Sequence, residues 1–413
     1  MGYQQGLSGL AGASNALDVI GNNIANANTV GFKSSTAQFA DMYANSVATS
    51  VNTQIGIGTT LNSVQQQFGQ GTINTTNSSL DVAINGNGFF QMSNNGVTTY
   101  SRDGTFQRDK NGYIVNAQGM NLMGYMADKN GVINTAQTVP LQAPTTNIAP
   151  TATTKITGQF NLNSQDTVPT KTPFDPNDHT TYNYSTAIQV YDSLGGSQAV
   201  NMYFVKSAAG TWEAYAGVQG GATTDLGTIT FNAAGAISST TTGTPATPTA
   251  SLGQFQFTVP NTDGSATPQQ LTLDLTGTTQ YGGKDGVNNL AQDGYASGTL
   301  TTYSIGADGK LTGNYSNGQT AVLGQIALAN FNNPNGLVNL GGNQYAESAA
   351  SGVPQISAPG STNHGTLQGS ALENSNVDLT SQLVNLITAQ RNYQANAQTI
   401  KTQQTVDQTL INL

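Results

Sequence analysis

Near the amino terminus, apolar residues recur at alternating steps of three and four positions. The stripe consists of Leu10, Ala13, Leu17, Ile20, Ile24 and Ala27. A mean spacing of about 3.5 residues keeps one helical face turned toward a partner helix, as in a coiled coil. Val30-Gly31-Phe32 then supplies a glycine at which the helix is expected to stop. We therefore predict an N-terminal helix within residues 1–33.

The carboxyl end carries a second stripe with the same period. It consists of Leu379, Leu383, Leu386, Gln390, Tyr393, Ala397 and Ile400. Ser375, Asn376 and Asp378 precede it and have side chains that cap helix N-termini. Neither Pro nor Gly occurs from Ser370 onward. The pattern predicts a C-terminal helix within residues 366–413 that pairs with the N-terminal helix to form a coiled-coil domain.

Between the two ends, the period changes from that of a helix to that of a strand. Phe255, Phe257 and Val259 alternate with polar residues, and residues 271–275 repeat this pattern. Asn-Gly and Asp-Gly dipeptides are dense, and these residues supply the positive φ that tight hairpins require. The fold class we predict is mainly β with terminal α-helices.

Composition divides the β body into two all-β domains, one inserted in the other. Residues 135–172 are rich in Thr, Pro and Gln, and residues 236–252 form a comparable stretch of Ser, Thr, Gly and Pro. Such stretches are typical of linkers and loops. The predicted parts are a first β domain of residues 72–145 and 294–365, an inserted β domain of residues 146–293, and an extended connector of residues 34–71.

The composition also excludes most kinds of chemistry. Of 413 residues, 12 are Lys or Arg and 21 are Asp or Glu, so the net charge is −9 and 8% are charged. Cys is absent and the two His residues, His179 and His364, are far apart, which excludes disulfides and clustered Cys or His metal sites. So few cations cannot form the basic surface of a nucleic-acid-binding protein. We predict no enzymatic activity, no cofactor or metal, and no nucleic-acid or membrane partner.

Three local features have both a functional and a structural interpretation. Residues 109–112 are similar to a Ca²⁺ loop, but Gln118 stands where the bidentate carboxylate belongs, which favours a plain turn. Trp212 lies on an alternating stretch, and a buried strand position is favoured over sugar stacking. Arg391 and Lys401 interrupt the C-terminal stripe, and the rarity of charge slightly favours a subunit contact over a solvated helix face.

Neither stripe has the charged flanking residues that select a partner in many coiled coils. Flanks of Asn, Gln, Thr and Ala contact similar copies with little charge selectivity, which suits the core of a homopolymer. Such narrow stripes bury too little area in isolation to offset the entropy of ordering. We therefore expect both ends to be largely unfolded in the monomer and to become ordered on assembly.

Longer runs at both ends resemble the bacterial flagellar rod and hook axial proteins. Residues 17–33 read LDVIGNNIANANTVGFK and residues 100–106 read YSRDGTF. Residues 371–379 read ALENSNVDL and residues 389–397 read AQRNYQANA. The motif residues are Asn22, Asn23, Asn26, Asn28, Thr29, Gly31, Phe32, Lys33 and Arg391. Within this family, the length and the inserted β domain look like those of hook proteins.

The resemblance implies a structural subunit of the flagellar hook, which self-assembles into a curved helical tube and transmits motor torque to the filament as a universal joint. It implies that the terminal helices form an inner coiled-coil layer and that the inserted β domain is outermost. The implied partners are further copies of the chain, the distal rod protein, the hook cap, the hook–filament junction proteins and the type III export apparatus.

The resemblance also implies an extracellular location and export without a cleaved signal peptide. The first basic residue is Lys33, so the positive segment that opens a signal peptide is missing. Two alternatives remain open. One is a distal rod or hook-junction component, which would build straight tubes only. The other is a secreted carbohydrate-binding β protein with a coiled-coil stalk, which would need an exposed aromatic platform within residues 146–293.

Overall fold

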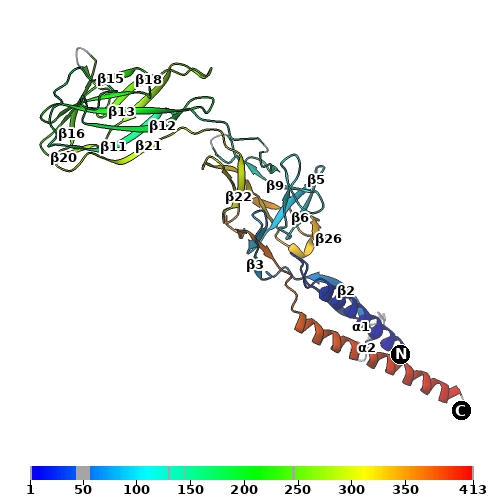
Figure 1. Ribbon diagram of the computed structural model, residues 1–413. Coiled ribbons are helices and arrows are strands. Elements are labelled where there is room, and N and C mark those ends of the chain that lie inside the picture. Colours follow the sequence, from blue (N-terminus) through cyan, green and yellow to red (C-terminus); the bar gives the residue numbers. More distant parts are fainter. Residues whose placement is uncertain (1, 43–55, 129–130, 145, 244–246, 412–413) are drawn as a thin grey trace. The chain divides into compact units, whose positions relative to one another are not determined.

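The computed structural model describes residues 2–42, 56–128, 131–144, 146–243 and 247–411. The chain forms two compact units (Figure 1). Unit 1 comprises Met1–Thr145, Thr301–Asn314 and Thr320–Leu413, and unit 2 comprises Thr146–Leu300 and Tyr315–Gln319. The fold is mainly β with helices near both termini, which confirms the predicted fold class.

Unit 1 contains helix α1 (Gly2–Ala25), helix α2 (Leu379–Ile411) and a set of short strands. These strands are β1 (Ser35–Met42), β2 (Gly58–Gln66), β3 (Ile73–Thr75), β4 (Val82–Asn85), β5 (Phe89–Asn94), β6 (Val97–Ser101), β7 (Gln107–Arg108), β8 (Ile114–Val115), β9 (Asn121–Met126), β10 (Val139–Pro140), β22 (Leu300–Ile305), β23 (Lys310–Tyr315), β24 (Thr320–Ile326), β25 (Leu328–Asn330), β26 (Val338–Gly341), β27 (Gln344–Ala346), β28 (Gln355–Ser357), β29 (Thr366–Gly369) and β30 (Ala371–Glu373). A 3₁₀ turn spans Pro334–Gly336.

The sheets of unit 1 join segments that are far apart in sequence. The main sheet has the order β22-β23-β24-β9-β5-β6-β27-β26 and covers a core that includes Phe90, Leu122 and Leu328. Two small antiparallel ladders pair β29 with β4 and β30 with β3. Because β29 and β30 lie just before α2, these ladders bond the segment that precedes the C-terminal helix to residues 73–85.

Unit 2 is a β-sandwich. Its strands are β11 (Lys155–Asn163), β12 (Tyr184–Tyr191), β13 (Ser197–Ala208), β14 (Thr211–Val218), β15 (Thr223–Phe231), β16 (Ile237–Thr242), β17 (Thr247–Pro248), β18 (Gln254–Val259), β19 (Gln269–Asp274), β20 (Thr279–Tyr281) and β21 (Gly286–Gln292). One sheet has the order β18-β19-β11-β20 with β21 also on β11, and the other runs in sequence order from β12 to β17. Side chains from both sheets share one core.

The core of unit 2 agrees with the alternation seen in the sequence. Phe255, Phe257 and Val259 are buried, with the intervening polar residues of β18 facing outward. Trp212 is fully buried, which confirms the structural interpretation of this residue and removes it from any sugar-stacking platform. In unit 1, Asp109 accepts hydrogen bonds from the backbone N–H groups of Asn111 and Tyr113, so residues 109–112 form the predicted turn.

Three boundaries differ from the sequence-based expectations. Residues 34–71 are not a simple extended connector, because β1 and β2 form an antiparallel ladder that satisfies their backbone groups. Part of that segment, 43–55, lies outside the described residues. Residues 366–378 do not extend the C-terminal helix, since β29 and β30 take up 366–369 and 371–373, residues 374–378 are neither helix nor strand, and α2 begins at Leu379. The Asp378 carboxylate caps α2 by accepting from the N–H of Thr380, as predicted.

The third correction concerns the end of α1. The helix ends at Ala25, so Ala27 lies outside it and the prediction that Ala27 belongs to the helical seam was wrong. Asn26 donates its side-chain amide to the carbonyl of Asn22, and the following N–H groups of Ala27 and Thr29 make three-residue turns. The Asn26 N–H still makes the helical bond to the Asn22 carbonyl, so the change to three-residue turns at Ala27 marks the end of the helix before the glycine.

Candidate functional site: the paired terminal helices and the charged junction

Helices α1 and α2 pack against each other in antiparallel directions within unit 1. Two glycines permit the close approach near the start of α1. A Cβ atom on Gly6 would lie 3.0 Å from Cγ1 of Ile400, and one on Gly9 would lie 2.6 Å from Oδ1 of Asn396. At the other end of the pair, Asn23 donates to Oε1 of Gln382 over 3.4 Å.

Another face of α1 packs on the β1–β2 hairpin. Gln5 donates to the carbonyl of Gly56 over 2.6 Å, and a Cβ on Gly12 would lie 3.3 Å from the methyl group of Thr59. A cavity of about 470 Å³ opens between the two helices and the hairpin. It is lined mainly by small side chains: Gly9, Gly12, Ala13, Ala16, Phe39, Thr59, Ala389, Asn392, Ala395 and Asn396.

The predicted stripe of α1 lies largely on its packed side. Ala13 is buried, and the other members within the helix are half-buried: Leu10, Leu17, Ile20 and Ile24. The stripe of α2 is rotated from the prediction. The buried or half-buried side of α2 includes Gln382, Leu386, Ala389, Asn396, Ala397, Ile400 and Gln403. Leu386, Ala397 and Ile400 were predicted, whereas Leu379, Leu383, Gln390 and Tyr393 are exposed.

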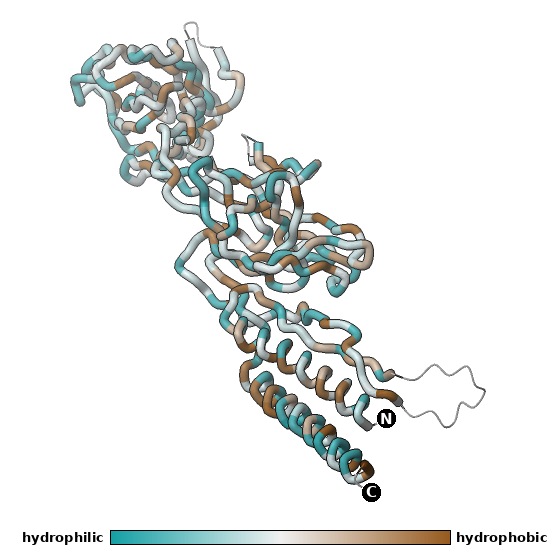
Figure 2. Tube along the Cα trace, turned by 90° about the vertical axis from the view of Figure 1, so that its right-hand side faces the viewer, coloured by the Kyte–Doolittle hydropathy of each residue, from teal (hydrophilic) through white to brown (hydrophobic). Residues whose placement is uncertain are grey.

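The large apolar residues of α2 therefore point mostly away from α1. Leu383 is 49% exposed, Ile387 51% and Leu410 66%. Figure 2 shows hydrophobic positions recurring along this helix among hydrophilic ones. The glycines of α1 explain the rotation, because a surface without side chains accepts Asn396 and Ile400 closely. Leu379, Leu383 and Ile387, spaced four residues apart, form a short apolar stripe of α2 that is left without a partner among the residues that the structure describes.

The Asn-rich motif holds the end of α1 against the strand that follows it. Asn23 is buried, and its side chain both donates to the carbonyl of Ser35 over 2.8 Å and accepts from the Ser35 N–H over 2.9 Å. Asn26 bonds to Asn22 and also accepts from the hydroxyl of Thr29 over 3.1 Å. These bonds set the direction in which the chain leaves the helix.

Gly31 stands where the chain turns toward the body of unit 1. Its φ is +68°, and a Cβ would lie 2.7 Å from the backbone of Arg102 and Asp103. Its N–H donates to the carbonyl of Glu373 over 2.8 Å. Both the conformation and the close approach therefore require glycine. Of the other motif residues, Asn28 and Arg391 are exposed and Phe32 is half-buried.

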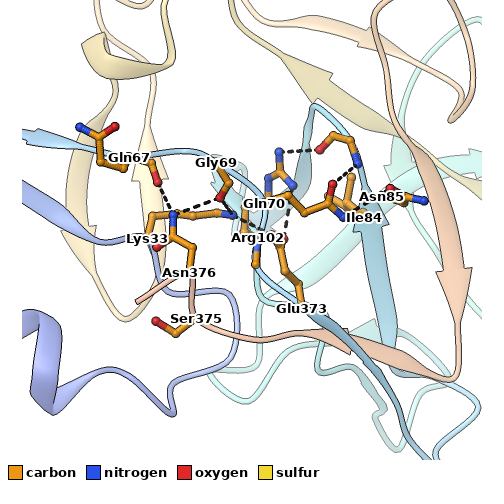
Figure 3. A network of polar contacts seen from close by, with 12 residues as sticks. Lys33, Gln67, Gly69, Gln70, Ile84, Asn85, Arg102, Glu373, Ser375 and Asn376 are labelled. Carbon is orange, nitrogen blue, oxygen red and sulfur yellow. Dashed lines mark hydrogen bonds and ion pairs between the residues drawn. The ribbon is translucent and has the colours of Figure 1, made fainter. Parts of the chain in front are cut away.

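Three charged side chains meet behind this turn (Figure 3). Nζ of Lys33 lies 2.7 Å from Oε1 of Glu373, and Nη1 of Arg102 lies 3.3 Å from Oε2 of the same carboxylate. The Lys33 and Glu373 side chains are fully buried and that of Arg102 is 3% exposed. Lys33 also donates to the carbonyl of Gly69, and Arg102 donates to that of Gly86. We call Lys33, Arg102 and Glu373 the charged junction.

Asparagine and backbone groups complete the surroundings of the charged junction. Asn376 accepts from the N–H of Ser34 over 2.8 Å and donates to the carbonyls of Gln67 and Gly69 (Figure 3). The N–H of Gly71 donates to the Glu373 carboxylate over 2.8 Å. The segment after α1, residues 67–71 and the segment before α2 are thereby bonded into one polar cluster.

The charges of the junction do not balance, because two cations share one carboxylate. Burial lowers the pKa of Lys33, and the positive charge of Arg102 lowers it further, while Glu373 opposes both effects. Burial likewise lowers the pKa of Arg102 against the attraction of Glu373. Nε of Arg102 is buried without a hydrogen-bond partner among the described residues. The junction therefore depends strongly on its single carboxylate.

Sequence reasoning identified Lys33 as a motif residue but assigned nothing to Arg102 or Glu373. Both lie in runs that carry the family resemblance, at 100–106 and 371–379. No local signal separates them from exposed charges, since Lys155 and Lys310 also stand beside apolar strand residues and have side chains that are about half exposed.

Within the described ranges, no group of three or more His, Asp or Glu side chains is placed to hold a metal ion. The helices there also include none with the length and apolarity needed to span a membrane.

Comparison with known proteins identifies the family. The model "Flagella basal body rod protein" matches residues 4–33, "Flagellar hook protein FlgE/F/G D1 domain" 83–157, "Flagellar basal body protein FlaE D2 domain" 161–295 and "Flagellar basal body rod FlgEFG protein C-terminal" 368–413.

Full-length proteins similar to this chain are named flagellar hook proteins. The chain is 43% identical to the flagellar hook protein FlgE of Salmonella typhimurium and 41% identical to that of Escherichia coli, with all of each chain covered. The crystal structure of Helicobacter pylori flagellar hook protein FlgE2 is 15% identical, with a TM-score of 0.49 over 73% of this chain and 99% of that one. On the full-length identities, this chain belongs to the bacterial flagellar hook protein family.

Proposed function

We propose that copies of this chain polymerise through α1 and α2 into a curved helical tube, the flagellar hook, which transmits motor torque to the filament. The observation that carries this proposal is the unpartnered apolar stripe of α2. Leu379, Leu383 and Ile387 are each about half exposed, and each would gain free energy by contact with another copy. The proposed inner seam joins this stripe to the small-residue cavity beside α1.

The proposed mechanism divides two tasks between helices and β units. Apolar seams resist sliding, because displacement by one residue moves their side chains out of register. The surfaces of unit 2 are polar and weakly charged, so contacts through them are individually weak and exchange at little cost. A tube built in this way keeps its bore while its outer contacts change during rotation. We place the exposed motif residues Asn28 and Arg391 in contacts between copies.

The wider proposal follows the hook family. We propose that the chain leaves the cell through the flagellar type III export apparatus without cleavage of a signal peptide and remains extracellular. Its neighbours in the flagellum would be the distal rod protein, the hook cap and the hook–filament junction proteins. A distal rod or junction component is less well supported, because the full-length relatives reported above are named hook proteins.

Paired substitutions on α2 test the proposed seam. Leu383→Asn with Ile387→Asn removes two apolar contacts from the exposed stripe without touching the α1 side of the helix. Since both side chains are about half exposed, the monomer should keep its circular dichroism spectrum and its melting temperature within a few degrees. Polymerisation, followed by sedimentation and electron microscopy, should be lost.

The matched control is Gln398→Asn with Thr402→Asn, which changes exposed polar positions of the same helix. This variant should build curved tubes like the unaltered chain. Tubes of normal length and curvature from the Leu383→Asn, Ile387→Asn variant would show that α2 does not use this stripe in the polymer. Straight tubes from the unaltered chain would instead favour the rod or junction alternative.

A further inference from the structure

The charged junction connects three segments that are far apart in sequence. Lys33 follows α1, Arg102 follows β6, and Glu373 ends β30 shortly before α2. We propose that the charged junction is a latch, in which the segment after α1 and the segment before α2 stay attached to unit 1 only as a pair. This inference concerns the single chain and goes beyond the proposed assembly.

The first argument is the imbalance of charge. If the segment before α2 leaves, Glu373 leaves with it, and Lys33 and Arg102 lose the carboxylate that offsets their burial and their mutual repulsion. A buried cation without a carboxylate is far more costly than a hydrated one. While the segment after α1 stays in place, Lys33 remains beside Arg102 and against the carbonyl of Gly69, and its detachment restores the full hydration of the ammonium. Loss of one segment therefore expels the other.

The second argument runs in the opposite direction. If the segment after α1 leaves, Glu373 loses the Lys33 ammonium from its carboxylate and the Gly31 N–H from its backbone carbonyl. Asn376 loses the N–H of Ser34 at the same time. These three donors reach three different acceptor atoms, so no single replacement restores them. The segment before α2 then keeps Arg102, the Gly71 N–H on Glu373, the bonds of residues 374 and 376 to the carbonyls of residues 67, 69 and 72, and its short ladder with β3.

The third argument concerns the hydrogen bonds that the two segments share with each other and with residues 67–72. Asn376 is bonded to carbonyl groups of residues 67 and 69 and to the N–H of Ser34, so one side chain spans both segments and the body. The N–H of Asn374 donates to the carbonyl of Thr72 over 2.9 Å. The bonds of the two segments are thus interleaved around one carboxylate, and opening one side exposes the other.

Amide hydrogen exchange of the full-length monomer tests the latch. In Glu373→Gln the side-chain shape is kept and the charge is removed, so two buried cations lose their counter-charge. The amides of Gly31 and Ser34 on one side and Asn374 on the other should exchange faster by roughly 100-fold, and by the same factor. The amides of β5 and β9 in the core of unit 1 should keep their rates.

A second variant covers the case in which Glu373→Gln does not fold. Lys33→Met leaves the neutral pair of Arg102 and Glu373, and it should accelerate exchange in both segments together by a smaller common factor. The control is Asp308→Asn, which breaks an ion pair with Lys310 whose side chains are about half exposed, and it should change neither segment. Faster exchange confined to one segment, or no change in either junction variant, would overturn the latch.

Discussion

Helix α2 and the core of unit 2 differ in how far their apolar side chains are exposed to solvent. In unit 2, Phe204, Trp212 and Leu273 lie fully buried between two sheets of the same chain. On α2, Leu383 and Ile387 remain about half exposed, although the helix is long and well formed. Full burial of such a side chain contributes about 1.5–3 kcal/mol. Unit 2 is therefore complete by itself, whereas α2 lacks a partner surface that another copy can supply.

The largest effect on stability should come from shortening a side chain at the centre of the core of unit 2. Trp212→Ala removes a fully buried indole and leaves a cavity, which should destabilise unit 2 by about 3–5 kcal/mol. Hydrogen exchange of β13 and β14 in denaturant measures this change. The control Tyr281→Ala removes an aromatic ring that is 54% exposed and should change stability by less than about 0.5 kcal/mol. Equal effects of the two substitutions would contradict the described core.

A smaller effect is expected at the turn between α1 and the body. Gly31→Ala forces a side chain into positive φ and against the backbone of Arg102, which should cost about 1–3 kcal/mol. Urea unfolding of unit 1 measures it. Gly21→Ala is the matched control, because its Cβ meets nothing within 4 Å and alanine favours a helix by about 0.5–1 kcal/mol. If Gly31→Ala were as harmless as Gly21→Ala, the chain would not make this turn.

The smallest effect concerns the stability of unit 2 at low pH. Burial raises the pKa of Asp274, but hydrogen bonds from Lys155 and Thr276 outweigh it and hold this pKa at about 2. A carboxyl whose pKa is lower in the folded than in the unfolded state stabilises the fold at every pH above its pKa in the unfolded state. That contribution is lost as pH falls from about 4 to about 2. Lys155→Met should make the loss of stability between about pH 4 and pH 2 modestly smaller, since the Lys155 side chain is 47% exposed. Identical pH profiles for the two chains would contradict the pairing.

Much of the fold follows from local patterns in the sequence. Alternation predicted β18, Asp378 was one of three predicted caps of α2, and a buried Trp212 followed from its place in a strand. The rotation of α2 did not follow, because it depends on where Gly6 and Gly9 of a distant helix leave room. Apolar periodicity identifies a stripe but does not identify which surface covers it.

The charged junction was even less accessible to sequence reasoning. Lys33 and Glu373 are separated by more than three hundred residues, and local propensity contains no information about their pairing. Their proximity comes from the β30–β3 ladder, which is set by the tertiary fold. The end of α1 was missed for a local reason, since the backbone changes from helical bonds to three-residue turns at Ala27, before Gly31.

Circular dichroism before and after polymerisation tests the central claim most directly. If the terminal helices obtain their stabilising partner surface from other copies, the helical signal of the monomer should be well below that expected for α1 and α2 together and should rise sharply as tubes form. The β signal of the two units should stay constant. A monomer that already has the full helical signal, with no increase on assembly, would contradict the account.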